Sequence, residues 1–251
     1  MRGPSGLLTR GWQRVTPALV VSGTAAVLSG LVIIWAARLT VPYPVYVSEL
    51  GAVGTPTAGP FQVALLCIAV GGLAIALAAG HARAQVRMLG RWLPAVTIGF
   101  AGVCFAVASQ VTCTATCPVP IVDPRSTTQD LVHTTFAVLG FAAACYAMLQ
   151  VAFSRRRPRI ARFSLVSCIA VGVISGVGGL LALVHVAVDF GSWLEFAGMT
   201  VAIAWLATYG LALVVEGRER SSAGESAVPD ARERVHGESP WTRGSGLSES
   251  A

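Results

Sequence analysis

The sequence predicts an all-α fold, a polytopic transmembrane bundle of six helices with both termini in the cytoplasm. Of the 251 residues, 54% are hydrophobic and only 12% are charged, about half the charged share of a soluble domain. Six apolar runs of about 20 residues recur along the chain, and each is long enough to cross ~30 Å of hydrocarbon. This composition cannot supply the polar surface that a soluble protein of the same length requires.

The apolar runs divide the chain into three segments. The first run is too long for the apolar region of a signal peptide, and no small-residue cleavage site follows it, so we expect an uncleaved first span. The end of the chain is rich in Ser, Gly, Glu and Arg and cannot bury enough apolar surface to offset its chain entropy. We therefore predict a cytoplasmic N-terminal segment (1–16), a transmembrane domain (17–215) and a disordered cytoplasmic tail (216–251). The predicted spans cover residues 17–37, 61–80, 92–111, 130–153, 163–184 and 193–215.

Arginines on alternate connections set the predicted orientation. All 18 basic residues are arginines, which with abundant Ala, Gly and Val indicates a bacterial protein from a GC-rich genome. Eleven of them lie before the first run and after the second and fourth runs, whereas the intervening loops hold only Arg38 and Arg125. Because basic loops stay cytoplasmic, we expect a multi-pass protein of the bacterial plasma membrane with both termini inside. No aromatic-rich basic stripe accompanies the arginines, so the net charge of +6 does not indicate a nucleic-acid partner.

The acidic residues outside the tail and two histidines fall on the predicted extracytoplasmic side. Ionisable groups at membrane depth are costly and tend to face a bundle interior or a wet cavity. Helix capping is the alternative for two of the acids. Thr127 can cap the helix that contains Asp130, and the spacing Ser192-x-x-Glu195 matches a capping box. The histidines are, in the alternative, interfacial polar residues. Our main prediction is an outward-facing polar pocket lined by Glu49, Asp130, His133, His185, Asp189 and Glu195.

The histidines and two of the acids raise the question of a cofactor. His185 and Asp189 are four residues apart in the sequence, which places both side chains on one helix face. With His133 and Glu49 they form a hypothetical divalent-metal site, since zinc accepts imidazole and carboxylate ligands. The pattern is looser than H-E-x-x-H, so no cofactor is predicted and the metal remains an alternative. A haem held between His133 and His185 is a second alternative.

Two cysteines and two glycines carry structural predictions. Cys113 and Cys117 form C-T-A-T-C in the second predicted external loop, where an oxidising compartment permits a disulfide between them. Their spacing is not the C-x-x-C of redox sites. Gly172 and Gly176 form a G-x-x-x-G step in the fifth predicted span. We expect this step to pack within the bundle, because small residues let helix backbones approach closely in lipid.

Three short motifs resemble one known family. The segment Tyr46–Ala52, with the sequence Y-V-S-E-L-G-A, resembles the I-S-[DE]-L-G motif of the bacterial membrane family catalogued as domain of unknown function 998. Val122–Pro124, followed by Asp130–His133, is similar to that family's acidic loop and to the histidine that enters the next helix. Asp189–Trp193 is similar to the polar, tryptophan-bearing segment before the family's last span.

The resemblance covers most of residues 17–215 and departs from the family in two places. The pair Cys113 and Cys117 is an insertion, and a V-P-I-V-D stretch stands where a phenylalanine-proline-acid step is expected. The resemblance implies six helices, an outward-facing set of polar residues and no established activity. By position in the motifs, it marks Ser48, Glu49, Gly51, Asp123 and His133.

Our first functional hypothesis is a non-enzymatic integral membrane protein that binds a lipid, a small amphiphile or a partner protein in the outward pocket. The sequence contains no Walker-type phosphate loop, G-x-S-x-G elbow or H-E-x-x-H motif. The first alternative is a metal-dependent intramembrane lipid hydrolase or transferase, in which His133, His185 and Asp189 hold a metal that activates water. The second alternative is a small permease or exporter component, although the halves show no internal repeat. The lipid bilayer is the expected surrounding partner, and the oligomeric state stays open.

Overall fold

The structure of the chain is a computed structural model, which describes residues 5–79, 84, 86, 89–120, 122–154, 158–184 and 186–226. Toward the chain ends, side chains are described from residue 17 up to residue 219 and at residue 222. The chain divides into two units, Met1–Val214 and Val215–Ala251, and we call the first unit the bundle. The described residues form six α-helices, two 3-10 turns and no β-strand. These elements are α1 (Ser5–Thr40), η1 (Ser48–Gly51), α2 (Ala58–Ala78), η2 (Leu89–Arg91), α3 (Pro94–Gln110), α4 (Thr128–Ala152), α5 (Pro158–Val184) and α6 (Val188–Ser226).

Five of these helices are long and apolar enough to cross a membrane. They are the Pro17–Thr40 part of α1, the whole of α2, α4 and α5, and the Val188–Glu219 part of α6. The apolar helix α3 has only 17 residues, which rise about 25 Å. Soluble proteins rarely expose large contiguous apolar patches, so the exposed aliphatic side chains indicate a membrane-embedded protein. The predicted all-helical architecture is confirmed. Such exposed side chains include Leu28, Val32, Val70 and Ile169.

Helix ends differ from the prediction at both ends of the chain. Helix α1 begins at Ser5, so most of the predicted polar segment 1–16 is helical. Helix α6 continues to Ser226, so residues 216–226 of the predicted disordered tail are helical, while residues 227–251 lie outside the described residues. The first extension contains Leu and Arg, and the second contains Glu, Arg and Ala, which are residues that form helices well. Extending a helix that already exists adds one hydrogen bond per residue without a new nucleus, so the extension is favourable.

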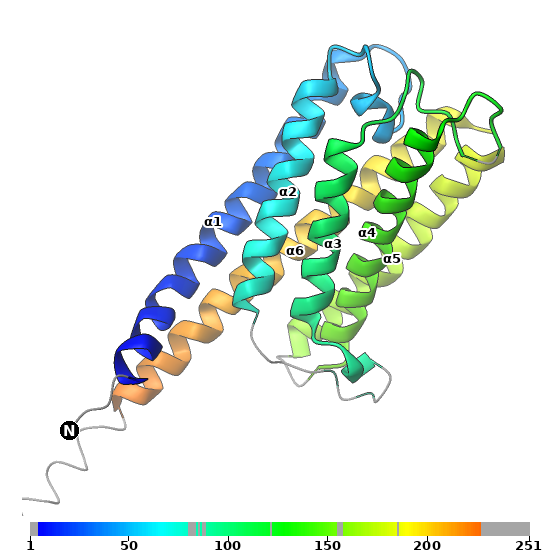
Figure 1. Cartoon of the computed structure of the whole chain (residues 1–251). Coiled ribbons are helices and arrows are strands. Elements are labelled where there is room, and N and C mark those ends of the chain that lie inside the picture. The colour runs from blue at the N-terminus through cyan, green and yellow to red at the C-terminus, as the bar shows by residue number, and fades with distance from the viewer. Residues whose placement is uncertain are drawn as a thin grey trace, which may run out of the picture. The chain divides into compact units, whose positions relative to one another are not determined.

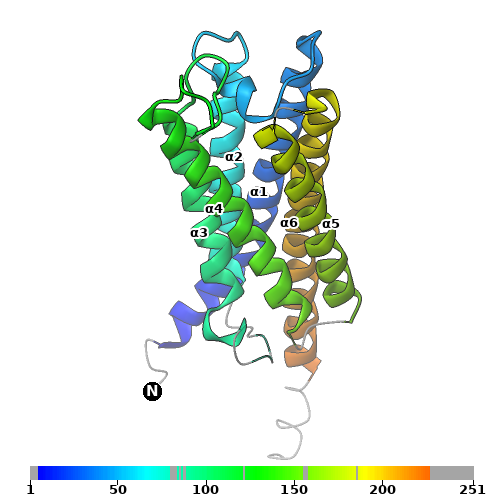
Figure 2. The ribbon, with the colours of Figure 1, turned by 90° about the vertical axis from the view of Figure 1, so that its right-hand side faces the viewer.

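Glycines bring α1 and α2 close together. Helices that follow each other in the sequence pack against each other from α1 to α5, and Figures 1 and 2 show α2 beside α1 and α4 beside α3. A Cβ added at Gly23 would lie 2.9 Å from the carbonyl oxygen of Gly71. One added at Gly30 would lie 2.7 Å from the carbonyl oxygen of Ala64. The α1–α2 contact therefore depends on small residues, as is common where helices associate in lipid.

The prediction that the glycine step of α5 packs within the bundle is wrong. A Cβ added at Gly172 or Gly176 would meet nothing within 4 Å among the described residues. At 100° per residue, this step is turned by about 100° or more from the buried face of the helix. That face packs instead through Gly178, whose added Cβ would lie 3.2 Å from the Cβ of Leu194 on α6. The buried residues of α5 are Ser164, Ser167, Val171 and Gly178.

The two ends of the bundle have different connections. One end carries η1 and the loop that contains the Cys113–Cys117 disulfide, and we call it the disulfide end (Figure 1). At the opposite end, the buried Gln150 of α4 donates its side-chain amide to the carbonyl oxygens of Leu89 (3.1 Å) and Trp92 (2.8 Å). These bonds fix the connection that leads into α3. The predicted pocket residues that the structure describes all lie at the disulfide end.

Candidate functional site

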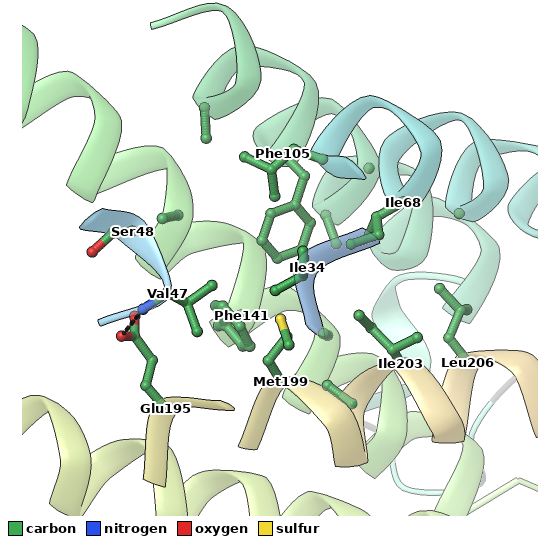
Figure 3. A pocket seen from close by; sticks show the side chains of 18 of the residues that line it. Ile34, Val47, Ser48, Ile68, Phe105, Phe141, Glu195, Met199, Ile203 and Leu206 are labelled. Carbon is green, nitrogen blue, oxygen red and sulfur yellow. Dashed lines mark hydrogen bonds between the residues drawn. The ribbon is translucent and has the colours of Figure 1, made fainter. Parts of the chain in front are cut away.

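A cavity of about 100 Å³ lies inside the bundle, between α1, α2, α3, α4 and α6 (Figure 3). For comparison, a cavity of ~150 Å³ lined by apolar side chains holds benzene, whereas pockets for drug-sized ligands measure roughly 300–1,000 Å³. The space therefore fits a short alkyl or aromatic segment. Its wall is mainly aliphatic and aromatic, with Ile34, Phe61, Leu65, Ile68, Ile98, Phe105, Phe141, Met199, Ile203 and Leu206 among the lining residues.

Three polar residues line the cavity toward the disulfide end. Ser48 comes from η1, His133 from α4 and Glu195 from α6. All three belong to the residues singled out in the sequence, and the fold brings them to one cavity from positions far apart in the chain. The cavity is thus amphipathic, with a polar end and a long apolar wall that the predicted polar pocket does not include.

Glu195 holds the loop after α1 against α6. Its Oε2 accepts a hydrogen bond of 2.7 Å from the backbone N–H of Val47 (Figure 3). Its second oxygen, Oε1, accepts no hydrogen bond from any residue that the structure describes. The predicted capping box at Ser192 and Glu195 is wrong, because α6 already begins at Val188. Inside that helix, Ser192 Oγ donates to the carbonyl oxygen of Asp189 (2.8 Å).

His133 is fixed by the end of α3. Its side chain is only 2% exposed, and its Nδ1 lies 3.0 Å from the carbonyl oxygen of Ala108 and 2.7 Å from that of Val111. The last carbonyls of a helix lack partners within that helix, and a carbonyl only accepts, so Nδ1 carries the proton. In a neutral imidazole, Nε2 is then the hydrogen-bond acceptor. The ring lines the cavity with its Nδ1 side already committed to the backbone.

Asp130 caps α4 and does not line the cavity. It is fully buried, and its Oδ2 accepts hydrogen bonds from the backbone N–H (2.8 Å) and hydroxyl (2.7 Å) of Thr127. Its Oδ1 accepts from the backbone N–H (2.7 Å) and hydroxyl (3.0 Å) of Thr114. The N–H of Asp130 in turn donates to Thr127 Oγ1 (3.4 Å), which completes a capping box. The capping alternative given for this acid is confirmed.

The family model described as protein of unknown function (DUF998) matches residues 20–212. The chain belongs to the DUF998 family. The match includes every residue that lines the cavity, from Ile34 to Leu206, and it confirms the family indicated by the sequence motifs. No curated protein and no solved structure matches the chain.

In this DUF998 protein, Glu49 and Gly51 shape η1 and do not line the cavity. Glu49 Oε2 accepts a hydrogen bond of 2.7 Å from the backbone N–H of Tyr46. Burial raises the pKa of the Glu49 carboxyl, and the hydrogen bond from Tyr46 offsets part of that rise. Gly51 is buried, and an added Cβ would collide with the ring of Phe61. Only glycine therefore lets η1 lie this close to the start of α2.

The remaining predicted residues lie away from the cavity or outside the described residues. Asp123 forms an ion pair of 2.7 Å with Arg125 near the protein surface, and Asp189 is exposed in the first turn of α6. His185 lies outside the described residues. Within the described part of the chain, no three His, Cys, Asp or Glu residues group closely enough to hold a metal ion.

The disulfide closes a short loop in the connection between α3 and α4 of the DUF998 protein, and this loop is hydrogen-bonded to two neighbouring segments. Cys113 and Cys117 are bonded, with a Cα–Cα distance of 5.0 Å. The carbonyl oxygen of Cys113 accepts a hydrogen bond of 2.9 Å from the N–H of Val53, which follows η1. Thr114, inside the disulfide loop, donates to Asp130 at the start of α4. The loop after α1, the disulfide loop and α4 are therefore held in one hydrogen-bonded network.

Sequence reasoning does not find the aromatic cluster beside Glu195. The Trp35 ring of α1 lies 5.3 Å from the Phe196 ring of α6, measured between centroids. The Arg38 guanidinium lies 5.4 Å from the centroid of the Trp193 ring, within the range of a cation–π interaction. The spacing of Trp35 and Arg38 places both on one face of α1. Their partners lie on the last helix, however, and no local pattern indicates that pairing.

Proposed function

We propose that this protein binds the apolar segment of a small amphiphile in its bundle cavity, as a non-enzymatic protein of the bacterial plasma membrane. The observation that carries the proposal is the amphipathic lining, an apolar wall that ends at Ser48, His133 and Glu195. An apolar segment gains about 25 cal/mol for each Å² that it removes from water. A head group at the polar end keeps its hydrogen bonds, so one molecule with both parts matches the whole cavity.

The size of the cavity narrows the ligand class. At about 100 Å³, it is smaller than the roughly 300 Å³ at which pockets begin to enclose drug-sized molecules. A single short chain fits this volume, whereas a complete two-chain lipid and a partner protein do not. The proposal therefore commits to a small amphiphile among the three ligand classes that the sequence raises.

Two features support an orientation in which the disulfide end faces outward. Disulfides persist in oxidising compartments and are rare in the cytosol, and the Cys113–Cys117 bond lies at this end. The opposite end holds the described arginines of the basic connections, Arg91, Arg159 and Arg162, and basic connections stay cytoplasmic. With six spans, this orientation leaves both termini in the cytoplasm and places the polar end of the cavity near the outer side of the membrane.

The first prediction tests the cavity by filling it. Ala137 lines the cavity and lies one helical turn after His133 on the same face of α4. Ala137→Phe puts a ring into the space, and we expect it to reduce labelling of cavity peptides about tenfold, equivalent to 1.4 kcal/mol of binding. The probe is a short photoreactive alkyl alcohol that carries a diazirine, added to the full-length protein in non-ionic detergent. Mass spectrometry of the labelled peptides gives the sites and their occupancy.

Ala25→Phe is the matched control, because Ala25 is exposed on α1 and does not line the cavity. We expect this variant to label like the wild type. The proposal fails if Ala137→Phe unfolds at the wild-type temperature and still labels its cavity peptides at the wild-type level. It also fails if wild-type labelling is confined to exposed faces of the helices.

A further inference from the structure

We infer that the polar end of the cavity selects a protonated amine, so that the ligand is a small cationic amphiphile. This inference rests on the proposed function and adds the chemical class of the head group. It is carried by the hydrogen-bonding capacity and the charge of the groups that face the cavity.

At the polar end of the cavity, the groups that are free to form further hydrogen bonds are mainly acceptors. Glu195 has one oxygen bonded to the Val47 N–H and a second oxygen without a described donor. His133 is 2% exposed, and the two backbone carbonyls at its Nδ1 place the proton of a neutral imidazole there, which leaves Nε2 as the acceptor. The hydroxyl of Ser48 adds a group that can accept as well as donate. A head group that fits this end must therefore donate several hydrogen bonds, and an ammonium group is a donor only.

Glu195 also lacks a cation. The ion pair between described residues joins Asp123 to Arg125 at the surface, and no described arginine lies within ion-pair distance of Glu195. Arg38, on the neighbouring helix α1, is occupied elsewhere, since its Nη1 donates to the carbonyl oxygen of Val41 (2.9 Å) and its guanidinium stacks on aromatic rings. A carboxylate beside an apolar cavity is costly without an opposite charge. A ligand ammonium supplies that charge and the missing donors together.

Other head groups match this end less well. A carboxylate or phosphate brings a second anion to Glu195 and adds only acceptors, so it is repelled and leaves the existing acceptors without donors. An alcohol donates one hydrogen bond and leaves the charge of Glu195 uncompensated. For one alkyl chain, the expected order of affinity is therefore amine, then alcohol, then carboxylate.

The test compares three ligands that share a chain and differ in head group: hexylamine, hexanol and hexanoate. Each competes with the photoreactive alcohol for the cavity of the full-length wild-type protein in non-ionic detergent near neutral pH. We expect hexylamine to compete about tenfold more tightly than hexanol, and hexanoate to be the weakest. This ranking needs no variant, so it does not depend on whether a mutated protein folds.

The variant Glu195→Gln then tests whether the preference for the amine comes from the Glu195 side chain. The glutamine oxygen can still accept from the Val47 N–H, so the change removes the charge and keeps the structural bond. We expect hexylamine to lose its advantage over hexanol, while hexanol binds as before. Glu49→Gln is the matched control, because Glu49 lies on η1 outside the cavity lining, and it should keep the amine preference.

The outcomes separate this inference from the proposed function. If the three ligands compete equally and Ala137→Phe abolishes all three, the cavity binds amphiphiles but the amine preference is wrong. If Glu195→Gln retains the preference, the assignment to Glu195 is wrong. If no ligand competes at a site sensitive to Ala137→Phe, the proposed function and the amine preference both fall.

Discussion

Asp130 and Glu195 are two carboxylates at the same end of the bundle, and they differ in how completely their oxygens are bonded. Asp130 is fully buried and accepts from the backbone N–H and the hydroxyl of both Thr114 and Thr127. Glu195 accepts from one described donor, the N–H of Val47, and lines the cavity. A carboxylate whose acceptor sites are filled by its own chain stabilises the fold. A carboxylate with unused capacity at a cavity is available to a ligand.

Neutralising each acid tests this difference, and the largest effect is expected at Asp130. In Asp130→Asn, the amide nitrogen faces threonine donors that previously met a carboxylate oxygen. Hydrogen bonds to charged groups contribute about 1.5–3 kcal/mol each. The amide oxygen of the asparagine still accepts some of the hydrogen bonds that the carboxylate accepted. We expect the free energy of unfolding to fall by about 3 kcal/mol, measured by denaturant unfolding in detergent.

Glu195→Gln is the matched change for that measurement. Because the glutamine oxygen still accepts from Val47, we expect a loss below about 1 kcal/mol. Equal losses in the two variants would contradict the division into a structural acid and a ligand-binding acid. If Glu195→Gln lost more free energy of unfolding than Asp130→Asn, the roles assigned to the two acids would be reversed.

The next largest effect is expected for the loop that supplies donors to Asp130. Replacing both cysteines of the disulfide, in Cys113→Ser/Cys117→Ser, releases the segment that carries Thr114. Because the closed loop is short, we expect a loss near the lower end of the range for disulfides, about 2 kcal/mol. The control is Cys67→Ser, since Cys67 is a free cysteine of α2, and it should unfold like the wild type.

Combining the disulfide variant with Asp130→Asn sharpens the same comparison. If the loop stabilises the protein by presenting Thr114 to Asp130, the two losses overlap and their sum exceeds the loss of the combined variant. A coupling of about 0.5–1 kcal/mol is expected for residues in one hydrogen-bond network. Strictly additive losses would show that the disulfide acts independently of Asp130.

Most of the fold, but only part of the site, is predictable from the sequence. The apolar runs determine the helices because lipid leaves few alternatives for such segments. Asp130 and Glu195 look alike in the sequence, since each follows a Thr or Ser at the spacing of a capping box. Thr127 does cap α4, whereas α6 begins at Val188, before Ser192. The position of a helix start, which depends on the preceding turn, therefore decides which acid is structural.

Tertiary partners explain the other differences between prediction and structure. The glycine step at Gly172 and Gly176 satisfies the local pattern for close packing, but no described helix lies against it. Close packing occurs instead between Gly23 on α1 and Gly71 on α2, which form no local motif. The apolar character of the cavity follows from side chains on five helices, so a search confined to ionisable residues finds only its polar end.

The last prediction concerns Glu49, whose neutralisation is expected to raise rather than lower the free energy of unfolding near neutral pH, and by the smallest amount. Burial raises the pKa of Glu49 above its ordinary value of 4.5, despite the hydrogen bond from the Tyr46 N–H. The folded state therefore holds the proton more tightly than the unfolded chain. The stabilisation that comes from this tighter proton binding by Glu49 is complete below pH 4.5. It is lost as the pH rises through the pKa that Glu49 has in the folded state.

Glu49→Gln keeps an oxygen for the Tyr46 N–H and removes the titration. We expect the variant to match the wild type at acidic pH and to be slightly more stable near neutral pH. The gain should be smaller than the losses predicted for Asp130→Asn and for the disulfide variant. Unfolding temperatures of both proteins across that pH range measure the difference. If the wild type instead gains stability over Glu49→Gln as the pH rises, the charge of Glu49 is compensated in the folded state. Glu49 would then resemble Asp130 rather than stand apart from it.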